Sequence, residues 1–401
     1  MWRDTQPAPP DPILGLTEAW KADPNPQKVN LGVGVYQDEQ GRTPVLPSVK
    51  AAEAALLGRE TTKAYLPIAG EPEYARRVEE LVFGAGDRPA GGGRVRTAYA
   101  PGGTGALRVA GDLAAALGGR GHTVWLSTPT WPNHRGIFSA AGLETREYPY
   151  FHAATGSLDR DGFRAALERV PVGDLVVLHA GCHNPTGVDL EEPDWEWVAA
   201  TAQARGWIPV VDAAYLGFAG TVEQDAAPLR RLLAAGVNFL VAVSFSKNMS
   251  LYRERVGALV LAAADTGSAD AIFSHVKRVI RVLYSNPAAH GALTATAVLS
   301  DALLRSMWDR EVAEMRARLA AVRTAFSDAL SARMPDRDFG FIRRQRGLFS
   351  FTGLTPAQTT RLRERYGIYM TADGRVNVVG LTPANLDYVA DAIAETIRAV
   401  A

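Results

Sequence analysis

The sequence has only one cysteine, Cys182, and its positive and negative charges cancel. A single thiol excludes an internal disulfide and a thiolate metal cluster, and it is typical of proteins from a reducing compartment. The 43 Lys and Arg residues equal the 43 Asp and Glu residues, so there is no net charge to attract nucleic acid or an anionic membrane. We therefore expect anions to be recognised by individual cationic side chains in a pocket.

Long hydrophobic runs are also missing. No stretch approaches the length of a membrane span, and positions 1–10 are polar and rich in proline, unlike an export signal. These features predict a cytoplasmic protein without a membrane partner. At 401 residues the chain is long enough for two domains and a large core.

Short apolar runs that end in small or polar residues recur through the middle of the chain. They are Val124–Leu126, Leu175–Leu178, Ile208–Val211, Leu240–Val243 and Val256–Val260. Segments with the apolar spacing of helices lie between them, for example between positions 107 and 117. This alternation predicts an α/β fold, with a mostly parallel sheet covered by helices on both faces.

The pattern changes beyond about residue 301. An apolar stripe predicts a long helix from Asp309 to Leu330. Residues 349–353 and 375–379 alternate like half-buried strands, and residues 383–400 resemble a closing helix. We therefore expect a smaller α+β unit at this end of the chain.

One segment, residues 244–255, sets a lysine among hydroxyl groups and places an arginine eight residues later. Lys247 follows an apolar run, so it would lie past the carboxyl end of a parallel strand, where ligands of such sheets bind. Its amine can form a Schiff base with pyridoxal phosphate, while Ser244 and Arg255 can bind the phosphate of that cofactor. A lone Ser-x-Ser-Lys match is weak, but this placement predicts that Lys247 is catalytic.

Other segments carry groups that suit the same cofactor. Gly103 and Thr104 open a helix after a glycine-rich turn and can offer N–H groups and a hydroxyl to a phosphate. Asp212 ends an apolar run and needs a cationic partner when ionised, which a protonated pyridine nitrogen would be. Tyr215 can reach the phenolic oxygen of the cofactor. Helix N-caps are the alternative interpretation of Thr104 and Asp212.

Asn184 can donate its amide to the same phenolic oxygen, and Trp131 offers a flat face for stacking on the pyridine ring. Taken alone, the segment of Asn184 is explained by a turn, and an aromatic residue beside prolines, such as Trp131, is more often a packing residue. Three histidines, His134, His179 and His183, lack a third ligand at metal-site spacing, so we predict no metal. We expect His134 to orient Asp212 and the other two to be packing residues.

Together these residues resemble the class I aminotransferases of the aspartate and aromatic amino acid group, which have the type I pyridoxal phosphate-dependent transferase fold. The resemblance runs from Asp11 through residues 29–36 to residues 374–378, with the motifs in the family's order. It implies an aminotransferase that moves the α-amino group between aspartate or aromatic amino acids and 2-oxoglutarate by a ping-pong mechanism. It also implies a large cofactor domain of residues 44–314 and a small domain of residues 1–43 and 315–401.

The resemblance also implies a role for each candidate residue. Lys247 would be the Schiff-base lysine and proton carrier, and Asp212 the partner of the pyridine nitrogen. Tyr215 and Asn184 would contact the phenolic oxygen, and Trp131 would stack on the ring. The phosphate would be held by Gly103, Thr104, Ser244, Arg255 and, from the neighbouring subunit, Tyr65. This last match implies a homodimer with shared active sites.

Two arginines would define the substrate. Arg375 matches the arginine that binds the substrate α-carboxylate through two parallel hydrogen bonds, with support from Asn184 and Gly34. Arg281 matches the residue that holds a side-chain carboxylate from the other subunit, and its spacing to Tyr284 favours it over Arg278. Two such anchors keep the α-carboxylate in the ring plane, which favours amino transfer over decarboxylation, elimination or racemisation.

The pocket-lining positions match both branches of the group. Ser250 and residues 65–70 and 345–349 resemble the aromatic branch. Residues that resemble the aspartate branch are Val35, Thr43, Thr104 and Asn286. We therefore predict an enzyme that accepts both dicarboxylic and aromatic amino acids.

Two other functions stay open at this point. Gln37, Ala64 and Ala69 match neither branch, which is compatible with an aminotransferase dedicated to an unusual, for example β-substituted, amino acid. A non-catalytic regulator that senses pyridoxal phosphate would need a DNA-binding module. The family match begins by Asp11, which leaves no room for such a module, and the balanced charge offers no basic surface.

Overall fold

The computed structural model describes residues 2–3, 5–7, 13–85, 90–118 and 121–400. Asp11, where the family resemblance begins, lies outside these residues. The chain forms two compact units, one of residues 44–317 and one of residues 1–43 and 318–401. The second boundary falls inside helix α12, Ala302–Arg333.

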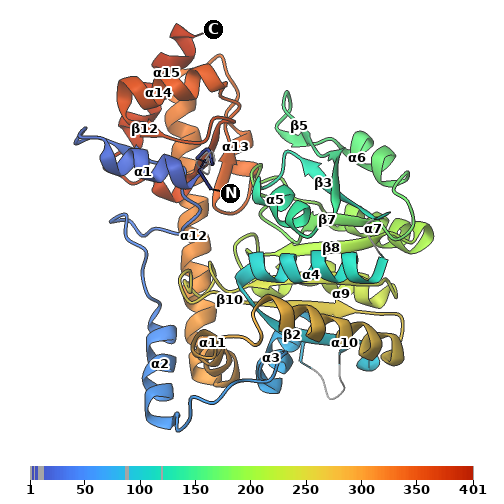
Figure 1. The fold of residues 1–401 in the computed structure, drawn as a ribbon. Helices are drawn as coiled ribbons and strands as arrows, with labels where there is room; N and C mark the ends of the chain where they lie inside the picture. The colour runs from blue at the N-terminus through green and yellow to red at the C-terminus, as the bar shows by residue number, and fades with distance from the viewer. Residues whose placement is uncertain (1, 4, 8–12, 86–89, 119–120, 401) are drawn as a thin grey trace. The chain divides into compact units, whose positions relative to one another are not determined.

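A seven-stranded sheet forms the centre of the unit of residues 44–317 (Figure 1). In spatial order its strands are β2 (Val95–Pro101), β10 (Val256–Ala262), β9 (Phe239–Ser244), β8 (Ile208–Ala213), β7 (Leu175–His179), β3 (Thr123–Thr128) and β4 (Glu144–Pro149). The five strands from β9 to β4 run parallel, which confirms the predicted mostly parallel sheet. The sequence does not predict β2, and β10 runs antiparallel to both of its neighbours.

Helices cover both faces of this sheet (Figure 1). The helices of this unit, besides the start of α12, are α2 (Pro47–Arg59), α3 (Pro72–Phe83), α4 (Gly102–Gly118), α5 (Asn133–Ala140), α6 (Arg160–Leu167), α7 (Glu192–Arg205), α8 (Val222–Asp225), α9 (Ala227–Ala234), α10 (Thr266–Leu283) and α11 (His290–Ser300). Buried side chains of α4, α5 and α10, such as Leu107, Phe138 and Val276, pack with the strands in one hydrophobic cluster. Strands β7, β9 and β10 are buried at every position, as expected for strands covered on both sides.

Side chains at the helix ends explain several boundaries. Glu191 and Asp194 form a capping box at the start of α7, and Gly206, at φ 76°, ends that helix in the left-handed region. Asp301 accepts hydrogen bonds from the backbone N–H groups of Leu303 and Leu304, at 2.9 and 3.0 Å. This cap explains why α12 begins earlier than the apolar stripe predicts.

The unit of residues 1–43 and 318–401 is smaller. Its strands form two pairs, β1 (Val29–Asn30) with β12 (Ile368–Tyr369) and β11 (Phe349–Phe351) with β13 (Arg375–Asn377). Its helices, besides the end of α12, are α1 (Leu14–Ala22), α13 (Phe341–Arg344), α14 (Pro356–Tyr366) and α15 (Leu386–Ala399). The two predicted strands and the closing helix are therefore present. None of the helices formed by the described residues is long and apolar enough to cross a membrane.

Candidate active site

Several candidate residues of the sheet-containing unit lie at one edge of its sheet. Asp212 lies near the carboxyl end of β8, Ser244 ends β9, and α4 begins directly after β2. The start of β10 lies at the same edge, because Gly257 pairs with Ser244 in the ladder. Residues that follow β2, β8 and β9, and those that precede β10, are thereby brought together. Sequence spacing alone does not give this last arrangement, since it depends on the antiparallel direction of β10.

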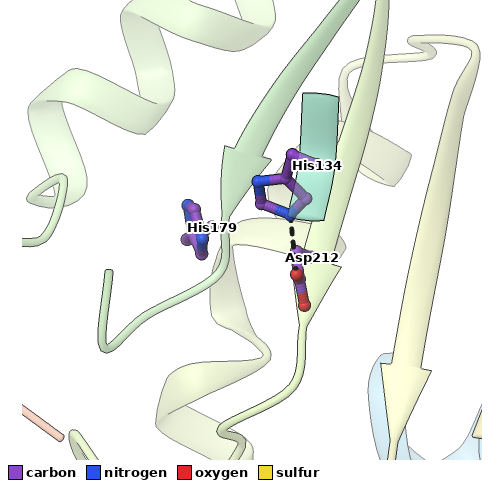
Figure 2. Close-up of side chains that lie close together, drawn as sticks. All are labelled: His134, His179 and Asp212. Carbon is purple, nitrogen blue, oxygen red and sulfur yellow. Dashed lines mark hydrogen bonds and ion pairs between the residues drawn. The ribbon is translucent and has the colours of Figure 1, made fainter. Parts of the chain in front are cut away.

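Asp212 is buried and makes its main side-chain contact with His134 (Figure 2). Its Oδ2 atom lies 3.1 Å from His134 Nε2, and its Oδ1 accepts a hydrogen bond from the N–H of Ala214 at 3.1 Å. Thr130 Oγ1 lies 2.8 Å from the other ring nitrogen of His134 and fixes the ring. Burial raises the pKa of Asp212, but the hydrogen bond with His134 and the nearby basic side chains outweigh burial and hold this pKa below its ordinary value. Asp212 is therefore a carboxylate suited to face a cation.

His179 lies next to this pair because it is the ladder partner of Asp212 on β7. One ligand-capable atom from each of His134, His179 and Asp212 lies within 4.8 Å of the others (Figure 2). The three could hold a metal ion, although two of these groups are already bonded to each other. The absence of a metal stays a prediction.

His183, expected to be a packing residue, also makes specific hydrogen bonds. Its Nε2 lies 2.9 Å from Ser127 Oγ and its Nδ1 lies 2.8 Å from Thr186 Oγ1. Its ring stacks on Tyr150 with centroids 4.0 Å apart. Burial holds the pKa of His183 well below its ordinary value, so the ring is neutral.

We predict that folding stability falls in acid because of His179. Burial lowers the pKa of His179 from 6.5 to about 3, so between these values the unfolded chain binds a proton that the folded chain does not. The free energy of unfolding should therefore decrease by about 1.4 kcal/mol per pH unit for this group as the pH falls below 6.5. Urea unfolding at neutral pH and at mildly acidic pH measures this loss.

The variant His179→Asn should show a shallower dependence on pH than the unmodified protein. His152→Asn, which changes an exposed histidine, is the matched control. Equal pH dependence in the unmodified protein and in His179→Asn would contradict the prediction.

Lys247 lies in the turn that follows β9, with its amine 4.9 Å from the centre of the Tyr215 ring. Burial lowers the pKa of this amine; the charge of Asp212 opposes that shift and the charge of Arg255 adds to it. A lowered pKa increases the fraction of neutral amine, which is the nucleophilic form. Tyr215 is itself buried, two residues beyond the end of β8.

A cradle for an anion lies at the start of α4. Gly102 has φ 71°, and a Cβ atom there would lie 2.6 Å from Arg255 Nη2, so only glycine allows this close approach. A Cβ atom on Gly103 would lie 3.3 Å from the Ser244 side chain. Arg255 also donates to Ser246 Oγ at 3.3 Å. Backbone N–H groups of a long helix, two hydroxyls and an exposed guanidinium therefore meet here, which fits the phosphate of the expected cofactor.

The remaining candidates of this unit have varied surroundings. Trp131 is half-buried, and its ring meets His134 edge to face with centroids 5.3 Å apart. Asn184 is buried, and Thr104 is half-buried in the first turn of α4. Tyr65 is 91% exposed. The structure thus brings Trp131 to the Asp212 side of the site and leaves Tyr65 on the surface.

Arg281 and Arg278 are both exposed on the last turns of α10. Arg281 donates to the Ser285 hydroxyl, in the loop that follows the helix. Asn286, in the same loop, donates to the Leu66 carbonyl at 3.1 Å, so the loop is tied to the segment that carries Tyr65.

Arg375 belongs to the other unit, where it lies on β13 and is 2% exposed. Its guanidinium lies over the Phe349 ring at 4.3 Å from the centroid and donates to the Gly32 carbonyl at 2.9 Å. Gly34 lies against the same ring, because a Cβ atom there would be 2.9 Å from Phe349. Arg375 and Gly34 therefore both lie against one aromatic side chain.

Two of the positions that resemble the aromatic branch make structural hydrogen bonds. The Ser250 hydroxyl donates to the Pro44 carbonyl at 2.6 Å, and buried Gln345 accepts a hydrogen bond from Ser350. Their identity is therefore explained by backbone and side-chain packing as well as by substrate choice.

Known proteins resemble this chain over its whole length. The family model for aminotransferase class I and II matches residues 26–393. An aspartate aminotransferase from Salmonella typhi is 49% identical over 98% of this chain and 99% of its own. The crystal structure of an aromatic-amino-acid aminotransferase from Burkholderia pseudomallei, covalently bound to pyridoxal phosphate, has a TM-score of 0.95 at 46% identity and covers 99% of both chains. A psychrophilic aromatic amino acid aminotransferase from a Psychrobacter species, cocrystallised with aspartic acid, has a TM-score of 0.96 at 40% identity, covering 99% of this chain and 100% of its own.

The chain therefore belongs to the class I and II aminotransferase family. As a member of this family it is a pyridoxal phosphate-dependent transaminase, and the predicted fold class is confirmed. Its relatives include both aspartate and aromatic amino acid aminotransferases, the two branches that the sequence resembles.

Three residues near the site are not among the candidates that the sequence predicts. Ser246 contacts Arg255, and it is visible in the Ser-x-Ser-Lys pattern. Asn248 follows Lys247 and is fully buried, which no local pattern predicts. Trp308 is also buried and bonds to Asn248 from a helix sixty residues further on, so only the tertiary structure reveals it.

Proposed function

We propose that this chain transfers the α-amino group of aspartate and of aromatic amino acids to 2-oxoglutarate, with Lys247 as the catalytic residue. The observation that carries the proposal is the convergence of Lys247, Tyr215 and Asp212 at one sheet edge, beside the cradle formed at Gly102 and Arg255. The alternative proposal is an aminotransferase dedicated to one unusual amino acid.

Pyridoxal phosphate would be held by groups at that edge. Gly103, Thr104, Ser244 and Arg255 would bind its phosphate, and Asp212, oriented by His134, would face its ring nitrogen. Trp131 would stack on the ring, while Tyr215 and Asn184 would donate to the phenolic oxygen. Bound there, the cofactor would supply an electron sink for the bonds around the substrate α-carbon.

The protein's own residues would bind the substrate and move the proton. Lys247, with its lowered pKa, would take the proton from the α-carbon of the substrate and would deliver a proton again in the next step of the reaction. Arg375 would hold the α-carboxylate, a task in which the family resemblance also implies Gly34 and Asn184. Arg281 would hold the side-chain carboxylate of dicarboxylic substrates, and would turn away for aromatic ones because a ring cannot satisfy a buried guanidinium. Residues 44–314 would form the cofactor domain, and residues 1–43 and 315–401 the small domain.

Initial rates with 2-oxoglutarate test the substrate proposal, comparing aspartate, tyrosine, phenylalanine and tryptophan as amino donors. We expect rates of similar size for aspartate and for the aromatic donors. Transfer from aspartate alone would contradict a dual pocket. No transfer from any of the four would favour the dedicated enzyme.

We also propose a homodimer in which each active site takes Tyr65 and Arg281 from the neighbouring subunit. Large exposed apolar side chains support it: in the unit that carries the sheet, Leu57 is 86% exposed, Val282 87% and Leu303 68%. Such side chains on a surface are typical of an interface. A cytoplasmic location and the absence of nucleic acid and membrane partners remain predictions from the sequence.

Mixing two inactive variants tests the shared site. In a dimer of one Lys247→Ala and one Arg281→Ala subunit, one site carries both changes and the other carries neither. After equal amounts of the two variants exchange subunits, we expect about a quarter of the normal aspartate activity, by random pairing. No recovery in a mixture shown to have exchanged would contradict the assignment of Arg281 to the neighbouring site.

A further inference from the structure

The segment that carries Tyr215 is held through its backbone by side chains from outside it. We call residues 214–220 the Tyr215 loop; they connect β8 with α8. At one end of the loop, the buried Asp225 carboxylate accepts three backbone N–H groups, at 2.8, 3.1 and 2.7 Å. The donors are Gly217, Ala219 and Gly220.

One face of α12 holds the same loop from another side. Trp308, Val312 and Arg316 are spaced four residues apart, so their side chains project from one side of the helix. Arg316 donates to the carbonyls of Gly217 and Gly220, at 2.9 and 2.8 Å. Gly217 has φ 94°, and a Cβ atom there would lie 2.5 Å from Val312. The loop therefore packs on the helix too closely for any residue but glycine at this point.

Asn248 links this loop to the turn that carries Lys247. Its side-chain N–H donates to the Leu216 carbonyl at 3.1 Å. Its backbone carbonyl accepts a hydrogen bond from Trp308 Nε1 at 2.7 Å. Both Asn248 and Trp308 are fully buried, so water does not compete for these hydrogen bonds. One amide thus joins the residue after Lys247 to the residue after Tyr215.

We propose that Asn248 is a positioning residue of the reaction: seated by Trp308, its amide fixes the Tyr215 loop relative to Lys247. This inference rests on the proposed roles of Tyr215 and Lys247. Asp225 and Arg316 hold the glycine end of the loop, and Asn248 holds the end nearest the lysine. Loss of the amide removes the hydrogen bond between this turn and the Tyr215 loop, so the loop, and Tyr215 with it, would be held less closely in the position in which Tyr215 acts together with the Lys247 amine.

The variant Asn248→Ala tests the inference. We expect kcat to fall about tenfold, the scale of one buried hydrogen bond, while KM changes little. The pH midpoint at which the visible absorbance of the bound cofactor changes should also shift, because the Tyr215 hydroxyl acts at the same centre. In a Tyr215→Phe background, Asn248→Ala should lose most of its effect on kcat, since both changes act through one hydroxyl.

A matched pair of tryptophan variants separates positioning from general packing. Trp308→Phe removes the N–H that seats Asn248 and should reproduce part of the Asn248→Ala effect. Trp207→Phe changes another buried tryptophan, whose Nε1 has no hydrogen-bond partner among the described residues, and should leave kcat and the pH midpoint unchanged. Melting temperatures report any loss of folding in each variant.

The outcomes are distinguishable. Additive effects of Asn248→Ala and Tyr215→Phe with an unchanged pH midpoint would overturn the inference and leave the proposed function intact. Unmodified protein that shows no cofactor absorbance dependent on Lys247 would overturn the proposed function and the inference with it.

Discussion

Replacing Lys247 with alanine is expected to lower the rate of amino transfer by about 10⁴-fold or more, because the change removes both the covalent anchor and the proton carrier. The variant should still fold, since the Lys247 side chain lies half-buried in the turn after β9 and is not part of the hydrophobic cluster around the sheet. Steady-state rates with aspartate and 2-oxoglutarate measure the loss, and the absorbance band of the protein-bound Schiff base should be lost in parallel, leaving only the absorbance of the free aldehyde form of the cofactor.

Lys277→Ala is the matched control, because this lysine is exposed on α10, where its amine lies over the Phe273 ring. It should retain normal activity and absorbance. A Lys247→Ala protein that keeps more than a small fraction of the normal rate would contradict the assignment of the catalytic lysine.

Replacing Arg375 with alanine is expected to lower kcat/KM by about 10³-fold for every amino donor, aspartate and aromatic alike. The α-carboxylate is common to all of these substrates, and a charge that loses its buried partner is strongly destabilised. Arg281→Ala should instead penalise aspartate far more than phenylalanine, because only aspartate has a second carboxylate. The ratio of kcat/KM for aspartate to kcat/KM for phenylalanine therefore distinguishes the roles of the two arginines better than either value does alone.

Arg323→Lys is the matched control for Arg375. Arg323 is a buried arginine of the same unit and donates to the backbone carbonyls of Ile342 and Gly347, at 3.2 and 2.8 Å. Lysine cannot reproduce this fork of donors, so the melting temperature should fall while KM for the donors stays near normal. Loss of aspartate transfer with retained phenylalanine transfer in Arg375→Ala would contradict the assignment of the α-carboxylate to Arg375.

Much of this architecture could be predicted because the signals are local. The apolar runs that become β7, β8 and β9 end at the polar residues that the site uses, and parallel strands bring such ends to one edge. The antiparallel direction of β10 could not be read from a run of apolar residues, because strand direction depends on the connections and not on the strand's own composition.

Sequence patterns could not predict the hydrogen bonds around Lys247 either, for a different reason. Asn248 and Trp308 are sixty residues apart in the sequence and meet only when α12 packs against the turn that follows β9. His179 lies close to Asp212 because the two residues are partners in the pairing of β7 with β8. A rule based on the sequence spacing of metal ligands does not consider partners on neighbouring strands. Ser250 and Gln345 show the opposite difficulty, since positions that resemble one substrate branch also serve the fold.

Reductive trapping of the cofactor tests the central claim most directly. The full-length protein would be mixed with pyridoxal phosphate, treated with borohydride, digested and mapped by mass spectrometry. The account predicts one modified peptide, with the cofactor on Lys247, and no labelling of that peptide in Lys247→Ala. A cofactor fixed to any other lysine, or to none, would contradict it.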